Sequence, residues 1–274
     1  MNDGELTPKA VRDLLVAADA GARALLAPLL STAETLKAHG PAISEWLAVM
    51  SRVPEVLRYW DQHAPTVLKD ALGDAGLIVP VSQMSLPDMI ELLGACRDRG
   101  RDAAVAWVRE EYDRIFVEPG FLARLESTWA GHPLLGRRMG VLRDALRTHE
   151  HGFYGASVPT FIAQFEGLVA DLVEHHGQMN GTKLKEHVAK LAAKEPWTDD
   201  VVQSFISDTL LAKFAHGSAT PAFSRHAILH GGDVAYGTQT NSQTAILLID
   251  YLREVGIVNG GDTARASAST PHHE

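Results

Sequence analysis

The stretch that decides the fold runs Asn241-Ser242-Gln243-Thr244-Ala245-Ile246-Leu247-Leu248-Ile249-Asp250-Tyr251-Leu252-Arg253-Glu254-Val255. Asn241 or Ser242 is expected to cap a helix here, because short polar side chains accept hydrogen bonds from the free amides of a first helical turn. The helix is apolar on nearly all sides from Ala245 to Val255. Such a helix is typical of the buried centre of a protein, so the rest of the chain should pack around it.

Helical spacing of apolar residues recurs along most of the remaining sequence. It predicts helices at about 11–29, 43–50, 54–72, 87–99, 103–116, 134–150 and 153–176, and shorter helices that start at Thr182, near Thr198 and at Thr220-Pro221. The one strand-like run, from Gly76 to Val81, contains a proline and has no neighbour, which favours a buried loop over a sheet. The sequence therefore predicts an all-α protein.

Prolines and glycines near residues 118–120 and 131–133 indicate a boundary at about residue 130. The expected organisation is an N-terminal helical region of unknown role at 1–130 and a helical bundle at 131–258. The segment 259–274 is rich in Gly, Ser, Thr and Ala, a composition that favours a disordered tail.

Composition limits the class of protein. The chain has 274 residues and a formal net charge of −9, so it is not expected to coat nucleic acid, and any RNA site must be local. A single cysteine, Cys96, rules out an intrachain disulfide and favours a reducing compartment. The N-terminus is acidic, and no apolar run approaches the roughly 20 residues that cross a bilayer. A cytoplasmic protein with no membrane contact is expected.

Several chemically active side chains gather in Phe223-Ser224-Arg225-His226-Ala227-Ile228-Leu229-His230-Gly231-Gly232-Asp233-Val234-Ala235-Tyr236. On an ideal helix His226 and His230 lie one turn apart on the same side, while Arg225 lies about 140° from His230. The two histidines could simply satisfy carbonyls at the end of a helix. They could also bind zinc together with Asp233.

The segment Arg225-His226-Ala227-Ile228-Leu229-His230 resembles the signature of the HEPN family (higher eukaryotes and prokaryotes nucleotide-binding), which is Arg, a polar residue, three residues and His. The resemblance covers about residues 131–256, including the helix that starts near Tyr154 and the apolar helix after the motif. A second spacing match, Arg58 to His63, lacks the polar residue. The resemblance implies a HEPN-like helical bundle and a homodimer that builds one cleft from two motifs.

Active HEPN proteins are metal-independent endoribonucleases, so the resemblance implies cleavage of RNA to 2′,3′-cyclic phosphate ends with no cofactor. Arg225 would stabilise charge on the phosphate, and His230 would accept or donate a proton, because imidazoles change charge near neutral pH. His226 would orient the reacting groups. By analogy with the family the protein would be a toxin or a phage-defence effector. The alternative is a non-catalytic helical module for protein interaction or nucleotide binding.

Other residues are assigned supporting roles, each with a structural alternative. Glu166 either forms an ion pair that holds Arg225 or faces water. Tyr236 either stacks on a base or packs its ring on the core, and Asp233 supports the site or is a turn residue. Arg143 and Arg147 belong to a basic helix that also includes His149. This helix either follows the RNA backbone or is an ordinary solvated surface.

Overall fold

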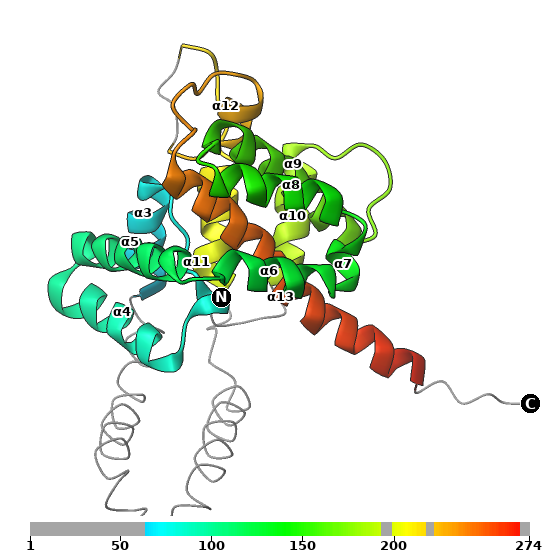
Figure 1. Ribbon diagram of the computed structural model, residues 1–274, viewed down its shortest axis with the longest axis horizontal. Helices are drawn as coiled ribbons and strands as arrows, with labels where there is room; N and C mark the ends of the chain where they lie inside the picture. The colour runs from blue at the N-terminus through cyan, green and yellow to red at the C-terminus, as the bar shows by residue number, and fades with distance from the viewer. Residues whose placement is uncertain (1–63, 193–198, 218–221, 269–274) are drawn as a thin grey trace, which may run out of the picture.

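The computed structural model describes residues 64–192, 199–217 and 222–268. Every regular element within these ranges is a helix, which confirms the all-α fold (Figure 1). The expected helices at 11–29 and 43–50 lie outside the described residues. The helices in chain order are α3 (Ala64–Ala75), η1 (Val81–Gln83), α4 (Leu86–Arg99), α5 (Arg101–Val117), α6 (Phe121–Ala130), α7 (Pro133–Gly136), α8 (Met139–Glu150), α9 (Tyr154–Leu172), α10 (Gly181–Ala192), α11 (Asp199–Ser204), η2 (Phe205–Leu210), α12 (Arg225–Leu229) and α13 (Gln239–Ala268).

Helix α13 is the central element, as its apolar sequence predicts. It crosses the middle of the molecule, drawn in orange and red in Figure 1, and packs against α9, α8, α7, α5 and η1. All residues from 242 to 250 are buried. The predicted cap is wrong, because the hydroxyl of Thr238 accepts from the backbone N–H of Asn241 at 3.1 Å. Ser242 is instead a buried member of the helix.

The C-terminal end of α13 also differs from the expected boundary. The helix continues to Ala268, into the segment 259–274 for which disorder was expected. Ala264, Ala266 and Ala268 have high helix propensity, which favours continuation of the helix. This part of α13 extends beyond the other helices in Figure 1.

The strand-like run is a buried loop, as predicted: Gly76 to Pro80 has no regular structure and is buried. The hydroxyl of Tyr112 accepts from the N–H of Ile78 and can donate to its carbonyl, each at 3.1 Å. Thr244 of α13 donates to the carbonyl of Gly76 at 3.1 Å. These bonds satisfy the loop's buried backbone groups and fasten it to the central helix.

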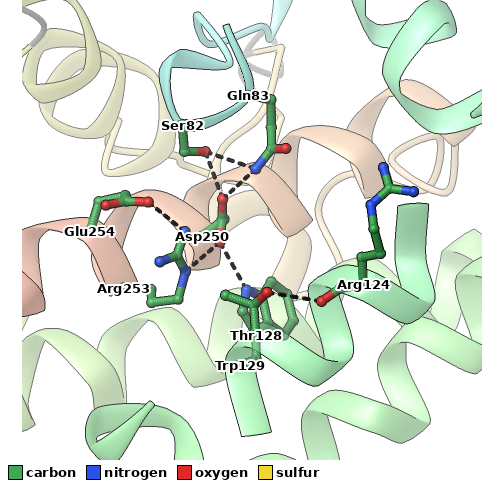
Figure 2. Close-up of polar contacts among 8 residues, drawn as sticks. All are labelled: Ser82, Gln83, Arg124, Thr128, Trp129, Asp250, Arg253 and Glu254. Carbon is green, nitrogen blue, oxygen red and sulfur yellow. Dashed lines mark hydrogen bonds and ion pairs between the residues drawn. The ribbon is translucent and has the colours of Figure 1, made fainter. Parts of the chain in front are cut away.

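A second group of polar contacts with α13 surrounds Asp250, whose side chain is fully buried (Figure 2). Its carboxylate accepts from Ser82 at 2.6 Å, Gln83 at 2.8 Å, Trp129 at 3.0 Å and Arg253 at 2.7 Å. Burial would raise the pKa of Asp250, but these hydrogen bonds and the charge of Arg253 hold it below its usual value. The carboxylate thereby joins η1, α6 and α13.

One hydrophobic core extends across the boundary that we placed at residue 130. Its buried members run from Leu68 in α3 to Val255 in α13. The packing within the described residues is therefore continuous on both sides of residue 130, and a division of the chain into functional regions there stays a prediction.

The basic helix expected at 134–150 is two helices. α7 ends at Gly136, and α8 begins at Met139 after a turn. Arg138 in this turn donates to Asp171 of α9 at 2.9 Å and to Gln164 at 2.9 Å. The turn aims this guanidinium at α9, where Gly167 leaves room for it.

Candidate functional site

The motif Arg225–His230 occupies α12 and its C-terminal cap. The hydroxyl of Ser224 accepts from the N–H of Ala227 at 3.3 Å and donates to the carbonyl of Ala212 at 3.1 Å. The helix therefore begins at Arg225 rather than at Thr220-Pro221, and residues 218–221 lie outside the described ranges. Its last residue is Leu229 and its C-cap is His230, and Gly231, with a φ of +70°, turns the chain out of the helix.

His226 and His230 lie next to each other on the surface. Both are exposed, and their ring centroids are 4.4 Å apart with the ring planes at 54°. Phe214 lies beside them, with its ring centroid 6.4 Å from that of His226. Both imidazoles can therefore reach one molecule from solvent.

Arg225 points toward α9, against which α12 packs. Its guanidinium forms an ion pair with Glu166, and each of the two side chains is 22% exposed. The pair that the sequence suggested is present. Within the described residues the Nε of Arg225, which is closed to solvent, has no hydrogen-bond partner.

A cavity opens beside this ion pair. It has a volume of about 340 Å³. Arg225 and His226 form part of its wall, and the other residues that line it are Gly181, Leu210, Leu211, Ala212, Lys213 and Phe214. Leu210 is the last residue of the π-helix η2, and the cavity begins where that helix ends. π-Helical turns are frequent at functional sites. The spacing of apolar residues in the sequence predicted neither the π-helix nor the cavity.

Tyr236 and Asp233 hold the loop that follows the motif. The hydroxyl of Tyr236 donates to the carbonyl of Gly155 at 3.0 Å, and its ring packs against the hydrophobic core. Asp233 accepts from the N–H of Ala235 at 2.7 Å, which is the geometry of a turn residue. These contacts agree with the structural alternative for each residue. Base stacking by Tyr236 stays a prediction.

The zinc alternative needs a third ligand for the histidine pair. In residues 64–192, 199–217 and 222–268 there is no group of three or more His, Cys, Asp and Glu residues that could hold a metal ion. The pair therefore offers two imidazole ligands at most from the described part of one chain.

The two arginines of α8 each lie near a carboxylate. Arg143 donates to Glu126 at 2.5 Å, and Arg147 lies 4.0 Å from Asp144. Arg147 is 63% exposed and so remains accessible to a ligand. A role of Arg143 and Arg147 in RNA binding stays a prediction.

His149 does not belong to the basic surface, although it follows Arg147 in sequence. It is 7% exposed, and its Nδ1 lies 2.7 Å from the hydroxyl of Ser242. Ser242 is in turn 2.8 Å from the hydroxyl of Ser157. Burial lowers the pKa of His149 to about 4. The signal was in the sequence, because His149 continues the apolar stripe formed by Leu142, Ala145 and Leu146.

Two findings reach beyond the candidate site. No helix among the described residues is long and apolar enough to span a bilayer. Comparisons with protein-family models, with curated proteins and with solved structures found no match to this chain.

Proposed function

We propose that this protein is a metal-independent endoribonuclease whose catalytic residues are Arg225, His226 and His230. The observation that carries the proposal is the exposed pair of imidazoles, 4.4 Å apart, on the same short helix as a guanidinium held by Glu166. Cleavage of RNA by its own 2′-hydroxyl needs a base, an acid and a cation. These three side chains can supply all three groups.

The reaction follows from these roles. One imidazole removes the proton of the 2′-hydroxyl, whose oxygen forms a bond to phosphorus while the bond from phosphorus to the 5′-oxygen breaks. The other imidazole donates a proton to the leaving 5′-oxygen. Arg225 stabilises the negative charge that grows on the phosphoryl oxygens, and Glu166 orients its guanidinium. The products are a 2′,3′-cyclic phosphate and a 5′-hydroxyl, with protons and charge balanced and no metal required.

The proposed site includes two copies of the chain. Two apolar side chains close to the histidines in sequence are exposed: Leu229 is 39% exposed and Val234 is 92% exposed. Burial of apolar surface is the main force in most protein associations, so a second chain that covers these residues would be stabilised. It would also bring a second Arg225–His230 segment to the same cleft.

Incubation of the purified full-length chain with end-labelled RNA in EDTA tests the proposal. The wild type should cleave the RNA. Arg225→Ala and His230→Ala should each lower the rate by about 100-fold or more, the usual range for loss of a proton-transfer or charge-stabilising group. Arg99→Ala and His176→Ala remove the same kinds of side chain from exposed positions elsewhere and should cleave normally. Equal cleavage by all variants would indicate a contaminating nuclease and overturn the assignment.

A non-catalytic nucleotide-binding module is the second candidate, favoured by the cavity beside Arg225. RNA that stays intact with the wild type, together with measurable nucleotide binding, would support this module over the enzyme. A toxin or phage-defence role has a separate test. Expression of the wild type in bacteria should arrest growth through loss of RNA, and His230→Ala should relieve the arrest.

A further inference from the structure

Basic side chains from two elements line the cavity beside the ion pair. Arg225 and His226 come from α12, and Lys213 comes from the segment after η2. Gly181, the first residue of the 12-residue helix α10, also lies at the wall, while the amide of Lys183 in that first turn donates to the side chain of Asn180 at 2.9 Å. No aspartate or glutamate is among the described residues that line it. The cavity therefore favours an anion.

Arg225 is prepared to bind such an anion. Glu166 engages one terminal nitrogen of the guanidinium, which fixes its position. The Nε atom is buried and has no partner within the described residues. Because Nε is closed to solvent, only the terminal nitrogens of the guanidinium can reach a ligand in the cavity. The planar guanidinium suits the oxygens of a phosphate group.

The remaining wall is apolar and includes an aromatic ring. Leu210, Leu211, Ala212 and Phe214 line this part of the cavity. The Phe214 ring lies directly against Gly232, where an added Cβ would be 2.1 Å from a ring carbon. Gly232 therefore lets the ring take its position at the cavity. Aromatic and aliphatic walls of this kind accept the flat face of a nucleobase.

The size of the cavity limits the ligand. Small-molecule sites start at about 300 Å³, and this cavity measures about 340 Å³. A volume near the lower end of that range suits one nucleotide and is too small for a folded stretch of RNA.

We infer that this cavity is a nucleotide subsite: it holds one nucleotide of the RNA next to the scissile bond, with the phosphate on Lys213 and Arg225 and the base against Phe214. The inference rests on the proposed ribonuclease function, because Arg225 and His226 belong to both sites. It adds the substrate unit that the enzyme recognises and two residues, Lys213 and Phe214, that bind it.

Calorimetric binding of adenosine 3′-monophosphate to the full-length His230→Ala protein tests the inference without turnover. Lys213→Glu in this background should weaken binding by about tenfold or more, the size of a lost charge-assisted hydrogen bond. Lys190→Glu makes the same charge change at an exposed position of α10 outside the cavity and should leave affinity within about twofold. Equal effects of the two variants, or no binding at all, would overturn the subsite.

Two further binding experiments test recognition of the phosphate and recognition of the base separately. Inorganic phosphate and adenosine should each bind more weakly than the nucleotide, because each makes half of the contacts. Gly232→Ala should displace the Phe214 ring and weaken nucleotide binding while phosphate binding is retained. Phosphate that binds as tightly as the nucleotide would refute recognition of the base and with it the inference.

These results are independent of RNA cleavage. If the wild type cleaves RNA but the nucleotide does not bind, or binds without any dependence on Lys213, the ribonuclease proposal is supported and the nucleotide subsite is refuted. If the nucleotide binds with the expected dependence on Lys213 while the wild type leaves RNA intact, the cavity stands as a nucleotide site and the ribonuclease proposal falls.

Discussion

Acid should destabilise this protein through His149. The imidazole is 7% exposed, and burial lowers its pKa to about 4 in the folded chain. An unfolded histidine has a pKa of about 6.5, so on acidification the unfolded state takes up the proton first. The contribution of neutral His149 to stability is therefore complete above about pH 6.5 and is lost as the pH falls from there toward 4.

The size of the effect follows from the two pKa values. A pKa of about 4 in the folded state and about 6.5 in the unfolded state corresponds to about 3 kcal/mol once the pH is below both values, and to about 2 kcal/mol at pH 5. The assay is urea unfolding of the wild type and His149→Gln at pH 7.5 and pH 5.0. Glutamine does not titrate, so the loss of stability between these pH values should be smaller in the variant by about 2 kcal/mol.

The comparison separates His149 from the other titrating groups, because these are shared by both proteins. His176→Gln is the matched control, since His176 is exposed, and it should keep the full pH dependence of the wild type. If wild type and His149→Gln lost the same free energy of unfolding on acidification, the burial argument for this histidine would be refuted.

Three further substitutions test the remaining contacts. Asp250→Asn should lower the free energy of unfolding by about 3 kcal/mol, measured by urea titration, because it removes the buried carboxylate opposite Arg253 and leaves that charge paired with Glu254, which is 46% exposed. Glu166→Gln should lower kcat for RNA cleavage by about tenfold with little change in KM, because Arg225 loses the charge that positions it. Val234→Asp should weaken self-association by about tenfold in analytical ultracentrifugation and lower cleavage at dilute protein, because it places a charge at the proposed interface.

Matched controls exist for each of these substitutions. Asp144→Asn, at a side chain that is 78% exposed, should change stability by less than about 0.5 kcal/mol. Glu186→Gln removes an exposed carboxylate of α10 and should leave kcat unchanged. Val117→Asp alters a valine that is 76% exposed at the end of α5 and should leave association unchanged. If a control variant changed the measured property as much as its test variant, the explanation for that test variant would be refuted.

The centre of the fold could be predicted because it depends on hydrophobicity alone. Residues 245–255 are apolar on nearly all sides, and such a helix is typical of the buried centre of a helical protein. The Gly76–Pro80 loop could be predicted for the same kind of reason, since its apolar residues require burial and its proline disfavours a sheet.

The ends of the helices could not be predicted, because tertiary contacts decide which polar residue acts as the cap. Ser242 is a good cap by residue type, but its hydroxyl contacts His149 and Ser157 in the core, and Thr238 caps α13 instead. Ser224 likewise caps α12 while it also binds the carbonyl of Ala212. The core partners of Ser242 and Ser224, which are His149, Ser157 and Ala212, lie 12 to 93 residues away in sequence, so a local pattern does not contain them.

The adjacency of His226 and His230 was predictable from their spacing, and the cavity beside His226 was not. The motif spacing alone placed His226 and His230 on one side of a helix, and the structure has their rings adjacent. The cavity could not be foreseen, because it depends on where the π-helix η2 ends and on the fit of Phe214 against Gly232. One feature of the sequence indicated the buried Asp250: it is the one charged residue in the apolar stretch from Ala245 to Leu252.

The most direct test of the central claim is the chemical identity of the RNA ends formed in EDTA. The account predicts that the wild type produces 2′,3′-cyclic phosphate and 5′-hydroxyl ends, and that Arg225→Ala and His230→Ala produce neither. RNA that remains intact with the wild type, or fragments with 5′-phosphate ends, would contradict it.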